Sequence, residues 1–308
     1  MKELWTEKYR PKTLDGYVFT DPAQREQIEY FVKEKSIPHL LFTGPAGTGK
    51  TTLAKILVNS LDIDPYDFLQ VNASRDNGVD FLKTKIEGFV STMPFGDLKI
   101  VLLDEADYLS HNAQAILRGL METYQAQARF ILTANIAHKI IPPIKSRCQQ
   151  IIIDKTDQTE FTARAATVLV TENIEFDLDT LDSYVKATYP DLRSCLKLLQ
   201  TNSVSGTLTI SKTSSSSSSA DYKLEVVNLF KQGKLREART LLCTHTSADE
   251  CEGIFTWMLH NLDLWSNTVE GQDEAIKIIC KGAVRHSSVA DHEINLSATF
   301  VELTQISS

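Results

Sequence analysis

The sequence predicts an α/β fold in which a parallel sheet with helices on both faces is followed by an all-helical region. Between residues 38 and 153, short apolar runs alternate with longer segments in which apolar residues recur at helical spacing. Strands that are buried on both faces form continuous apolar runs, so this pattern is typical of a parallel sheet. From about residue 157 onward, only the helical spacing remains.

Four segments have the composition of strands, and three isoleucines at 151–153 indicate a fifth. The four are HLLFT (39–43), DFLQVN (67–72), KIVLLD (99–104) and RFILTAN (129–135). Helical spacing between them covers residues 51–61, 79–93 and 110–124. The last of these helices is expected to begin at Ser110, a good N-cap residue. In the second helix, one face is expected to carry Val79, Leu82, Ile86, Phe89, Val90 and Met93.

The chain of 308 residues is long enough for more than one domain, and its composition changes at three points. Residues 1–153 form a first segment that contains the alternating pattern of 38–153, and residues 154–200 hold enough helical stripes for a small three-helix domain. Residues 201–220 are rich in Ser and Thr and are expected to form a flexible linker. The alternative is a structured loop with one short strand at 207–210. Residues 221–308 return to helical patterning.

The overall composition narrows the class of protein. Hydrophobic residues make up 42% and charged residues 23%, as in water-soluble globular proteins, and no apolar run approaches the ~20 residues that cross a bilayer. The N-terminal segment resembles neither a signal peptide nor a transit peptide. The five cysteines are odd in number and widely spaced, which argues against a disulfide framework and fits a reducing compartment. The net charge of −8 arises in the second half, so an anionic partner would have to meet a local basic strip in the first half.

One short stretch predicts a phosphate-binding loop. GPAGTGKT (44–51) fits the pattern G-x-x-x-x-G-K-[ST] and lies between an apolar strand and an amphipathic helix. Its glycines allow backbone N–H groups to point at phosphate oxygens, and the helix adds the positive end of its dipole. Lys50 is expected to reach the β- and γ-phosphates, and Thr51 is expected to bind Mg²⁺. Nucleotide binding is therefore predicted, with a decayed site as the alternative.

Two adjacent carboxylates end the strand at 99–104. Asp104 is expected to hold Mg²⁺ through water, and Glu105 to orient and deprotonate the attacking water, because ligands of parallel sheets bind at the carboxyl ends of strands. The alternative is an acidic run that only caps a helix. Asn135 ends the next strand, where it can hydrogen-bond the γ-phosphate or the water; taken alone, such an Asn is more often a turn residue.

Arg147 raises a separate question, because an arginine beside a buried strand needs an anionic partner. Glu122 is the only acidic residue between Asp107 and Arg147. One answer is a salt bridge within the chain. The other is a partner that belongs to a different molecule.

Taken together, the motifs resemble those of the small ATPase subunits of replication factor C and their tailed-phage counterparts. The stretches WTEKYRPKTL, GPAGTGKTT, VNASRDNGVD, LLDEADYLSHNAQAILRGLME, TAN, SRC and PDLRSCL occur in the family's order from residue 4 to about 200. The resemblance implies an AAA+ nucleotide-binding domain at 1–153, a helical lid domain at 154–200 and a collar domain at 221–308 that joins subunits. The chain departs from the family at Asn77, where a basic residue is more common. It also departs at DGYVFTDPA (15–23), which lacks the usual Val-Gly-Gln and favours the phage type.

The same resemblance implies roles for individual residues. Tyr9, Arg10 and Pro11 would wrap the adenine, with Val18 in contact. Asn72 would be the switch that holds Glu105 back until DNA arrives. Asn135 and Arg193 would be the two sensors of the γ-phosphate, although Arg193 is alternatively an exposed arginine near a helix cap. Arg147 would be the arginine finger that acts on a neighbour's ATP. The loop residues that contact the nucleotide would be Gly44, Pro45, Ala46, Gly47, Thr48, Gly49, Lys50, Thr51 and Thr52.

DNA contacts are implied for two helices that begin near Gly78 and Ser110. The residues concerned are Arg75, Gly78, Lys83, Lys85, Ser110, His111, Asn112 and Arg118. Contacts to phosphates carry no sequence code, which suits a protein that must accept any primer–template junction. The alternative for Lys83 and Lys85 is an ordinary solvated helix face.

The resemblance implies an ATPase subunit of a sliding-clamp loader with ATP and Mg²⁺ as cofactors. Several copies and a divergent subunit, expected as a pentamer, would open the clamp and load it onto primer–template DNA. No membrane partner is expected; a phage protein would act in the bacterial cytoplasm and a eukaryotic homologue in the nucleus. One alternative is a branch-migration helicase, which would carry a winged-helix domain after the lid. Another is a non-hydrolysing structural subunit, against which Lys50, Asp104 and Glu105 argue.

Overall fold

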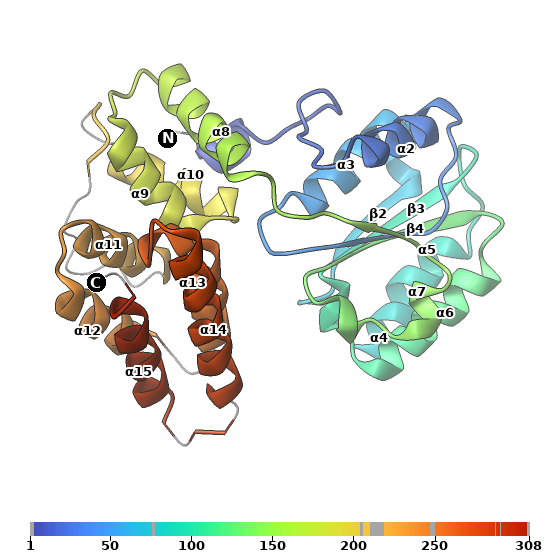
Figure 1. Cartoon of the computed structure of the whole chain (residues 1–308). Helices are drawn as coiled ribbons and strands as arrows, with labels where there is room; N and C mark the ends of the chain where they lie inside the picture. Colours follow the sequence, from blue (N-terminus) through green and yellow to red (C-terminus); the bar gives the residue numbers. More distant parts are fainter. Residues whose placement is uncertain are drawn as a thin grey trace. The chain divides into compact units, whose positions relative to one another are not determined.

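The computed structural model describes residues 3–75, 78–203, 206–209, 219–246, 250–286, 288–289 and 291–306. The chain divides into two compact units. One is formed by Glu7–Asp157, and the other by Gln158–Ser308 together with Met1–Thr6. The sheet belongs to the first unit, and helices α8 to α15 belong to the second (Figure 1).

The first unit is built around a five-stranded sheet. Its strands are β1 (Leu40–Thr43), β2 (Phe68–Asn72), β3 (Lys99–Asp104), β4 (Ala128–Ala134) and β5 (Gln149–Ile152). All neighbouring strands are parallel, in the order β2-β3-β4-β1-β5. In this register Asn72 lies beside Asp104, so the carboxyl ends of strands distant in sequence meet at one edge. The predicted parallel α/β fold is confirmed, although the edge strand β5 is less buried than predicted, with Ile152 56% exposed.

Helices cover both faces of this sheet (Figure 1). On one face lie α2 (Pro22–Lys33) and α3 (Lys50–Ser60), whose core includes Phe42 and Leu53. On the other lie α4 (Val79–Phe81), α5 (Gly88–Val90), α6 (His111–Thr123) and α7 (Pro142–Lys145), with Leu103 and Leu117 in a second core. The short helices are α1 (Trp5–Lys8), η1 (Pro65–Asp67), η3 (Ala106–Tyr108) and η4 (Ala137–Lys139). Ser110 caps α6 as predicted, because its hydroxyl accepts from the N–H of Ala113 at 3.2 Å.

The helix predicted at 79–93 is shorter and less regular than expected. From α4 it continues through a π-helical segment, η2 (Leu82–Glu87), and it ends with α5 at Val90. The prediction that Met93 joins the buried face is therefore wrong, since Met93 is 80% exposed. The helix ends because Pro94 disfavours helical backbone at Met93 and because the Thr92 hydroxyl donates back to a carbonyl of the last turn at 3.0 Å.

The second unit is helical throughout its described residues, apart from one isolated bridge between Glu175 and Thr207. We call three helices the lid helices after the predicted lid domain: α8 (Gln158–Thr171), α9 (Leu178–Thr188) and α10 (Leu192–Asn202). We call the others the collar helices after the predicted collar domain: α11 (Ser219–Lys231), α12 (Leu235–His245), α13 (Cys251–His260), η6 (Leu262–Leu264), α14 (Val269–His286) and α15 (His292–Thr304). The apolar spacing of residues 178–185 predicts a buried stripe that includes Leu178, but this prediction is wrong for Leu178, which is 75% exposed because it is the first residue of α9. None of the described helices is long and apolar enough to span a bilayer.

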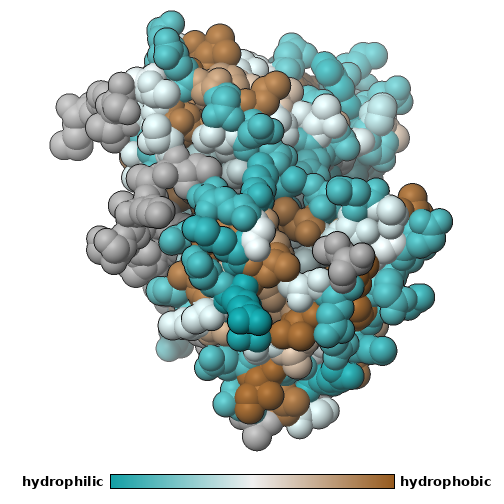
Figure 2. Space-filling view, turned by 60° about the vertical axis from the view of Figure 1, so that its left-hand side comes forward, coloured by the Kyte–Doolittle hydropathy of each residue, from teal (hydrophilic) through white to brown (hydrophobic). Residues whose placement is uncertain are grey.

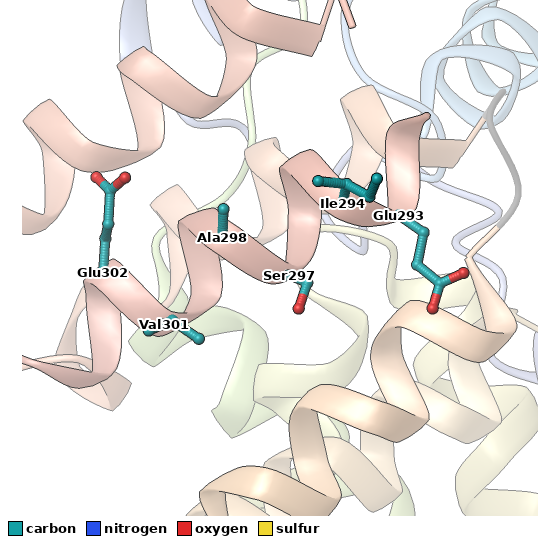
Figure 3. Close-up of a pocket in the computed structure, with 6 residues that line it drawn as sticks. All are labelled: Glu293, Ile294, Ser297, Ala298, Val301 and Glu302. Atoms are coloured by element: carbon teal, nitrogen blue, oxygen red, sulfur yellow. The ribbon is translucent and has the colours of Figure 1, made fainter. Parts of the chain in front are cut away.

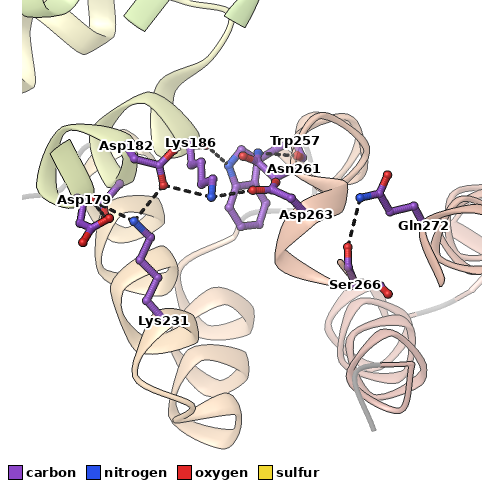
Figure 4. Close-up of polar contacts among 10 residues, drawn as sticks. Asp179, Asp182, Lys186, Lys231, Trp257, Asn261, Asp263, Ser266 and Gln272 are labelled. Carbon is purple, nitrogen blue, oxygen red and sulfur yellow. Dashed lines mark hydrogen bonds and ion pairs between the residues drawn. The ribbon is translucent and has the colours of Figure 1, made fainter. Parts of the chain in front are cut away.

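A cluster of acidic and basic side chains joins the lid helices to the collar helices within this unit (Figure 4). Lys186 on α9 pairs with Asp182 at 3.0 Å and with Asp263 of η6 at 2.6 Å. Lys231 on α11 also reaches Asp182, at 2.9 Å. Burial alone would lower the pKa of Lys186, but its hydrogen bonds to Asp263 and Asp182 raise that pKa above the ordinary value. These pairs hold α9 against α11 and η6.

The start of the predicted linker at 201–220 packs against the lid helices. α10 runs to Asn202, and Leu208 is 3% exposed. The N–H of Leu208 donates to the carbonyl of Glu175 at 2.8 Å, and the Tyr184 hydroxyl donates to the carbonyl of Thr209 at 2.8 Å. Residues 204–205 and 210–218 lie outside the described part of the chain.

Candidate active site

The predicted phosphate-binding loop connects β1 to α3, and a side chain would be strained at two of its glycines. A Cβ on Gly44 would lie 2.0 Å from the carbonyl oxygen of Ile153. Gly49 has a φ of 96°, which other residues rarely adopt, and it directly precedes α3. The sequence at 44–49 therefore folds into a loop whose end is the N-terminus of a helix, where backbone N–H groups are available to an anion.

Lys50 lies over this loop and is 6% exposed. Its ammonium group donates to the carbonyl oxygens of Gly44 at 2.9 Å and Pro45 at 2.6 Å. The hydroxyl of Thr48 also donates to the carbonyl of Pro45, at 2.9 Å. These bonds keep the cation at the place where the loop would hold phosphates.

Thr51, Asp104 and Thr133 meet at the carboxyl end of the sheet. The hydroxyl of Thr51 donates to Asp104 Oδ1 at 2.7 Å, and that of Thr133 donates to the same oxygen at 2.5 Å. A hydroxyl and a carboxylate offer the oxygen ligands that Mg²⁺ prefers. The residues present therefore fit a magnesium ion, and the binding of one by Thr51 and Asp104 stays a prediction.

Glu105 follows Asp104 with an unusual backbone. Its φ of 58° and ψ of 43° are left-handed, which costs a residue with a side chain about 1–2 kcal/mol. Two hydrogen bonds hold this conformation. The Glu105 N–H donates to Thr133 Oγ1 at 3.0 Å, and the Glu105 carbonyl accepts from the N–H of Tyr108 at 3.0 Å. The chain therefore turns away from the sheet at Glu105, directly after Asp104, the predicted metal ligand.

Two predicted polar residues lie where the strands on either side of β3 end, Asn72 as the last residue of β2 and Asn135 directly after β4. Asn135 is half-buried directly after β4, and the next N–H, of Ile136, donates to the buried carboxylate of Asp107 at 3.2 Å. Asn72 ends β2 beside Asp104, and its side-chain oxygen accepts from the N–H and the hydroxyl of Ser74 at 2.8 and 2.6 Å. No contact among the described residues joins Asn72 to Glu105, so its role as a switch stays a prediction.

Two residues of the N-terminal segment contact the loop and the start of α3. Arg10 donates through Nε to the hydroxyl of Thr52 at 3.1 Å. Sequence patterns missed Tyr17, whose buried ring lies 3.1 Å from where a Cβ on Gly49 would be and whose hydroxyl is 3.5 Å from the carbonyl of Thr48. The only feature of the sequence that pointed to Tyr17 is that it directly precedes Val18, a predicted adenine contact. Tyr9, Pro11 and Val18 are all half-buried, and their contact with adenine stays a prediction.

Comparison with known proteins matches residues 40–156 to the ATPase family associated with various cellular activities (AAA). A replication factor C small subunit from Saccharolobus solfataricus is 37% identical over 97% of this chain and 94% of its own length. The chain belongs to the replication factor C small subunits. The small subunit from Staphylothermus marinus is 34% identical over the same shares of both chains.

Solved structures with a similar fold include Thermotoga maritima RuvB. One such structure has a TM-score of 0.55 and 17% identity and covers 76% of this chain and 79% of its own. A second, described as a Holliday junction branch migration motor, has a TM-score of 0.54. At this identity the likeness concerns the fold alone. As a replication factor C small subunit, the chain is an ATPase subunit of a clamp loader.

In this small subunit, Arg147 lies at the turn between α7 and β5. It forms an ion pair with Glu122 on α6 and donates to the carbonyl of Pro143 at 2.8 Å.

The turn that carries Arg147 is positioned by Gln114, which sequence patterns also missed. Gln114 is buried; its amide donates to the carbonyls of Leu109 at 3.2 Å and Lys139 at 2.9 Å, and its oxygen accepts from the N–H of Ile141 at 2.9 Å. Gln114 therefore ties α6 to the segment that leads to Arg147.

The remaining predicted residues of this subunit lie on its surface. Arg193 is exposed at the start of α10, after the N-cap Asp191, and belongs to the second unit, so its role as a sensor stays a prediction. The predicted DNA contacts are all exposed: Arg75, Gly78, Lys83, Lys85, Ser110, His111, Asn112 and Arg118. Asn77 lies outside the described residues.

None of the residues described at this site is a cysteine or a histidine. All five cysteines are free, and burial raises the pKa of the Cys148 thiol to about 12. Among the described residues, no three His, Cys, Asp or Glu side chains gather into a metal-binding group. The spacing of Cys243, His245, Cys251 and His260 likewise fits no common zinc pattern.

Proposed function

We propose that this clamp-loader subunit binds ATP with Mg²⁺ and uses its hydrolysis to load a sliding clamp onto primer–template DNA. The observation that carries the proposal is the hydrogen bond of 2.7 Å between Thr51 and Asp104. It joins the phosphate-binding loop to the end of β3, where Glu105 follows. This is the arrangement that phosphoryl transfer to water needs, because that reaction is catalysed by positioning and charge rather than by a nucleophilic side chain.

Each residue of the site has one task in this proposal. The loop from Gly44 to Thr52 binds the phosphates through backbone N–H groups, with Lys50 adding positive charge. Thr51 and Asp104 would hold Mg²⁺, which neutralises charge on the phosphates when bound. Glu105 accepts the proton of the attacking water, and Asn135 orients that water. Arg10 and its neighbours Tyr9, Pro11 and Val18 enclose the base.

Arg147 would act on the ATP of a neighbouring subunit, so the complete site needs two copies. Its side chain is 36% exposed and sits at a turn, and the ion pair with Glu122 is exposed to a similar extent. A guanidinium in such a place can exchange a carboxylate for a phosphate, since both accept the same paired hydrogen bonds.

A hydrophobic patch on the first unit is the proposed contact for the clamp. We call Tyr66, Met93 and Phe95 the loop patch; they are 76%, 80% and 78% exposed, and the rings of Tyr66 and Phe95 are 5.6 Å apart. A contiguous group of exposed apolar side chains, unlike a single one, is typical of a protein contact.

Hydrogen bonds from two buried residues, Asp67 and Lys99, hold the segment of residues 91–98, which carries Met93 and Phe95. The fully buried Asp67 accepts from the N–H of Gly96 at 2.7 Å. Lys99, which is 3% exposed, donates to the carbonyl of Phe89 at 2.9 Å and to the hydroxyl of Thr92. A rigid loop loses little entropy on binding, which favours a stable contact.

DNA would meet the N-terminus of α6 and the helical stretch that begins at Val79. Ser110, His111 and Asn112 are exposed at the first turn of α6, where the helix dipole favours phosphate. The exposed cations Arg75, Lys83 and Lys85 lie before and along the other stretch. The three cations are the proposed local basic strip at which an anionic partner would meet this acidic chain.

Other subunits would pack against the collar. Hydrophobic side chains interrupt the hydrophilic surface of the molecule (Figure 2), and on α15 Ile294 is 67% and Val301 36% exposed. Figure 3 shows the side chains on this helix that line a pocket: Glu293, Ile294, Ser297, Ala298, Val301 and Glu302. The spacing of Ile294, Ala298 and Val301 is that of a helix face that packs against another helix. We include this face in the proposed subunit contact, with the number of subunits expected to be five.

The test is ATP hydrolysis by the reconstituted loader, measured with and without primed DNA and clamp. Stimulation by both together is expected, and a rate indifferent to both would contradict the proposal. A four-way DNA junction serves as the control substrate. Stimulation by the junction alone would favour the branch-migration alternative that the RuvB fold raises.

A further inference from the structure

Thr133 is a buried polar residue within the sheet. It lies in β4 between Leu132 and Ala134 and is 1% exposed. A hydroxyl removed from water to this extent needs hydrogen-bond partners inside the protein. The sequence pattern predicts nothing for it beyond a place in a strand.

The two partners of Thr133 determine where its proton points. The backbone N–H of Glu105 donates to Oγ1 at 3.0 Å and occupies one lone pair. Since a backbone N–H cannot accept, the hydroxyl proton is directed to Asp104 Oδ1, 2.5 Å away. One hydroxyl thus contacts both consecutive carboxylate residues, one through its side chain and the other through its backbone.

We propose that Thr133 is a positioning residue for ATP hydrolysis, which sets the carboxylate of Asp104 and the backbone of Glu105 at the same time. The proposal rests on the proposed roles of these two residues. Thr51 donates to Asp104 Oδ1 as well, so hydroxyls from α3 and β4 hold the same oxygen. All hydrogen bonds to this carboxylate from the described residues fall on Oδ1, so Oδ2 would be available to a water bound to Mg²⁺.

The backbone of Glu105 explains why a second anchor is needed. Its left-handed conformation is strained and persists only where neighbouring groups hold it. The Tyr108 bond belongs to the same turn and moves with it. The bond to Thr133 comes from a different strand, so it fixes the turn relative to the sheet and thereby aims the Glu105 side chain.

Two substitutions separate the hydroxyl from the volume of the side chain. Thr133→Val keeps the shape and removes both hydrogen bonds, whereas Thr133→Ser keeps the hydroxyl. Thr299→Val on α15 is the matched control, because Thr299 is also 1% exposed and its hydroxyl donates only within its own helix, to the Asn295 carbonyl at 2.9 Å.

Hydrogen exchange of the Glu105 amide in the full chain reports the geometry without any nucleotide. For Thr133→Val we expect exchange at this amide to accelerate roughly tenfold or more, with no change in Thr133→Ser or Thr299→Val. In the assembled loader, Thr133→Val should lower kcat roughly tenfold or more and leave KM for ATP within about threefold. It should also raise the Mg²⁺ concentration needed for half-maximal binding of a fluorescent ATP analogue.

Unchanged exchange and unchanged kcat in Thr133→Val would overturn the proposal, as would a Thr133→Ser variant as impaired as Thr133→Val. An isolated loss of nucleotide affinity in the absence of Mg²⁺ would also overturn it, because it would point to a disturbed phosphate loop. If the wild-type loader does not hydrolyse ATP, the proposed function fails. The exchange measurement still decides whether Thr133 holds Glu105.

Discussion

Arg147 forms an ion pair with Glu122 of its own chain, and the same carboxylate lies 3.8 Å from the guanidinium of Arg118. The side chains of Arg147 and Glu122 are 36% and 44% exposed. Exposed ion pairs contribute only about 0–1 kcal/mol to stability. The ion pair therefore holds Arg147 in place but contributes little to the stability of the fold. Arg147 can leave Glu122 at small cost to bind a neighbour's phosphate.

Arg147→Ala and Glu122→Gln should therefore differ. Loss of Arg147 is expected to lower the ATPase rate of the assembled loader about 10³-fold. Glu122→Gln should change the free energy of unfolding by less than about 1 kcal/mol and keep most of the activity. Steady-state hydrolysis and urea unfolding measure the two effects. Equal loss of activity in both variants would favour the salt-bridge alternative.

Mixed assemblies test whether Arg147 acts across subunits. A loader made from Arg147→Ala and Lys50→Ala chains contains interfaces at which an intact Lys50 faces an intact Arg147 of the neighbour. Activity should therefore reappear on mixing, at a level that depends on the ratio of the two chains. Assemblies that stay as inactive as the separate variants would rule out the action in trans.

Gly44→Ala should strongly destabilise the first unit. The new Cβ would lie 2.0 Å from the Ile153 carbonyl oxygen, and both are backbone-bound, so neither can move aside easily. We expect a loss of about 2 kcal/mol or more in the free energy of unfolding. Gly88→Ala is the control: its Cβ would meet nothing within 4 Å and the position is helical, so a gain of up to about 1 kcal/mol is expected. Urea titrations compare the two variants, and similar stabilities would refute the steric argument.

The loop patch should matter for the clamp but not for the fold. Met93→Ala combined with Phe95→Ala removes two side chains that are about four-fifths exposed, so stability should hardly change. Affinity of the loader for the clamp should fall roughly 30-fold or more if the patch is a binding hot spot. Val170→Ala, at another apolar residue that is 64% exposed, is the control. A double variant that binds the clamp as tightly as this control would exclude the patch.

His39 should make stability depend on pH. Burial, and then the charge of Arg129, lower its pKa from 6.5 to about 4, and its Nδ1 accepts from the N–H of Phe130 at 3.1 Å. Between these values the unfolded chain binds a proton that the folded chain does not, so stability should fall as the pH drops from 6.5 toward 4. The slope is at most about 1.4 kcal/mol per pH unit. His39→Asn keeps an acceptor without titrating, so urea unfolding should show a flatter profile; a wild-type profile that is already flat would contradict this.

Local patterns predicted most of the first unit correctly. Continuous apolar runs gave β1 to β4 to within a residue or two, because full burial on both faces leaves its trace in the residues themselves. The phosphate loop and Asp104–Glu105 could be predicted for a similar reason, because the residues of each motif are adjacent in the sequence. The helix at 79–93 was predicted too long, because apolar spacing alone does not register the effect of Pro94.

By itself, the sequence determined the parallel α/β fold, the phosphate-binding loop and the two carboxylates, since helical and strand periodicity and a fixed motif spacing are properties of short segments. Only the tertiary structure decided that Thr133 holds Asp104 and Glu105 together, that Tyr17 lies against Gly49, and that Glu122 faces Arg147. These residues are far apart in the chain. They meet because strand order places β3 beside β4 and because helices fold back over the sheet, and no local periodicity encodes that order.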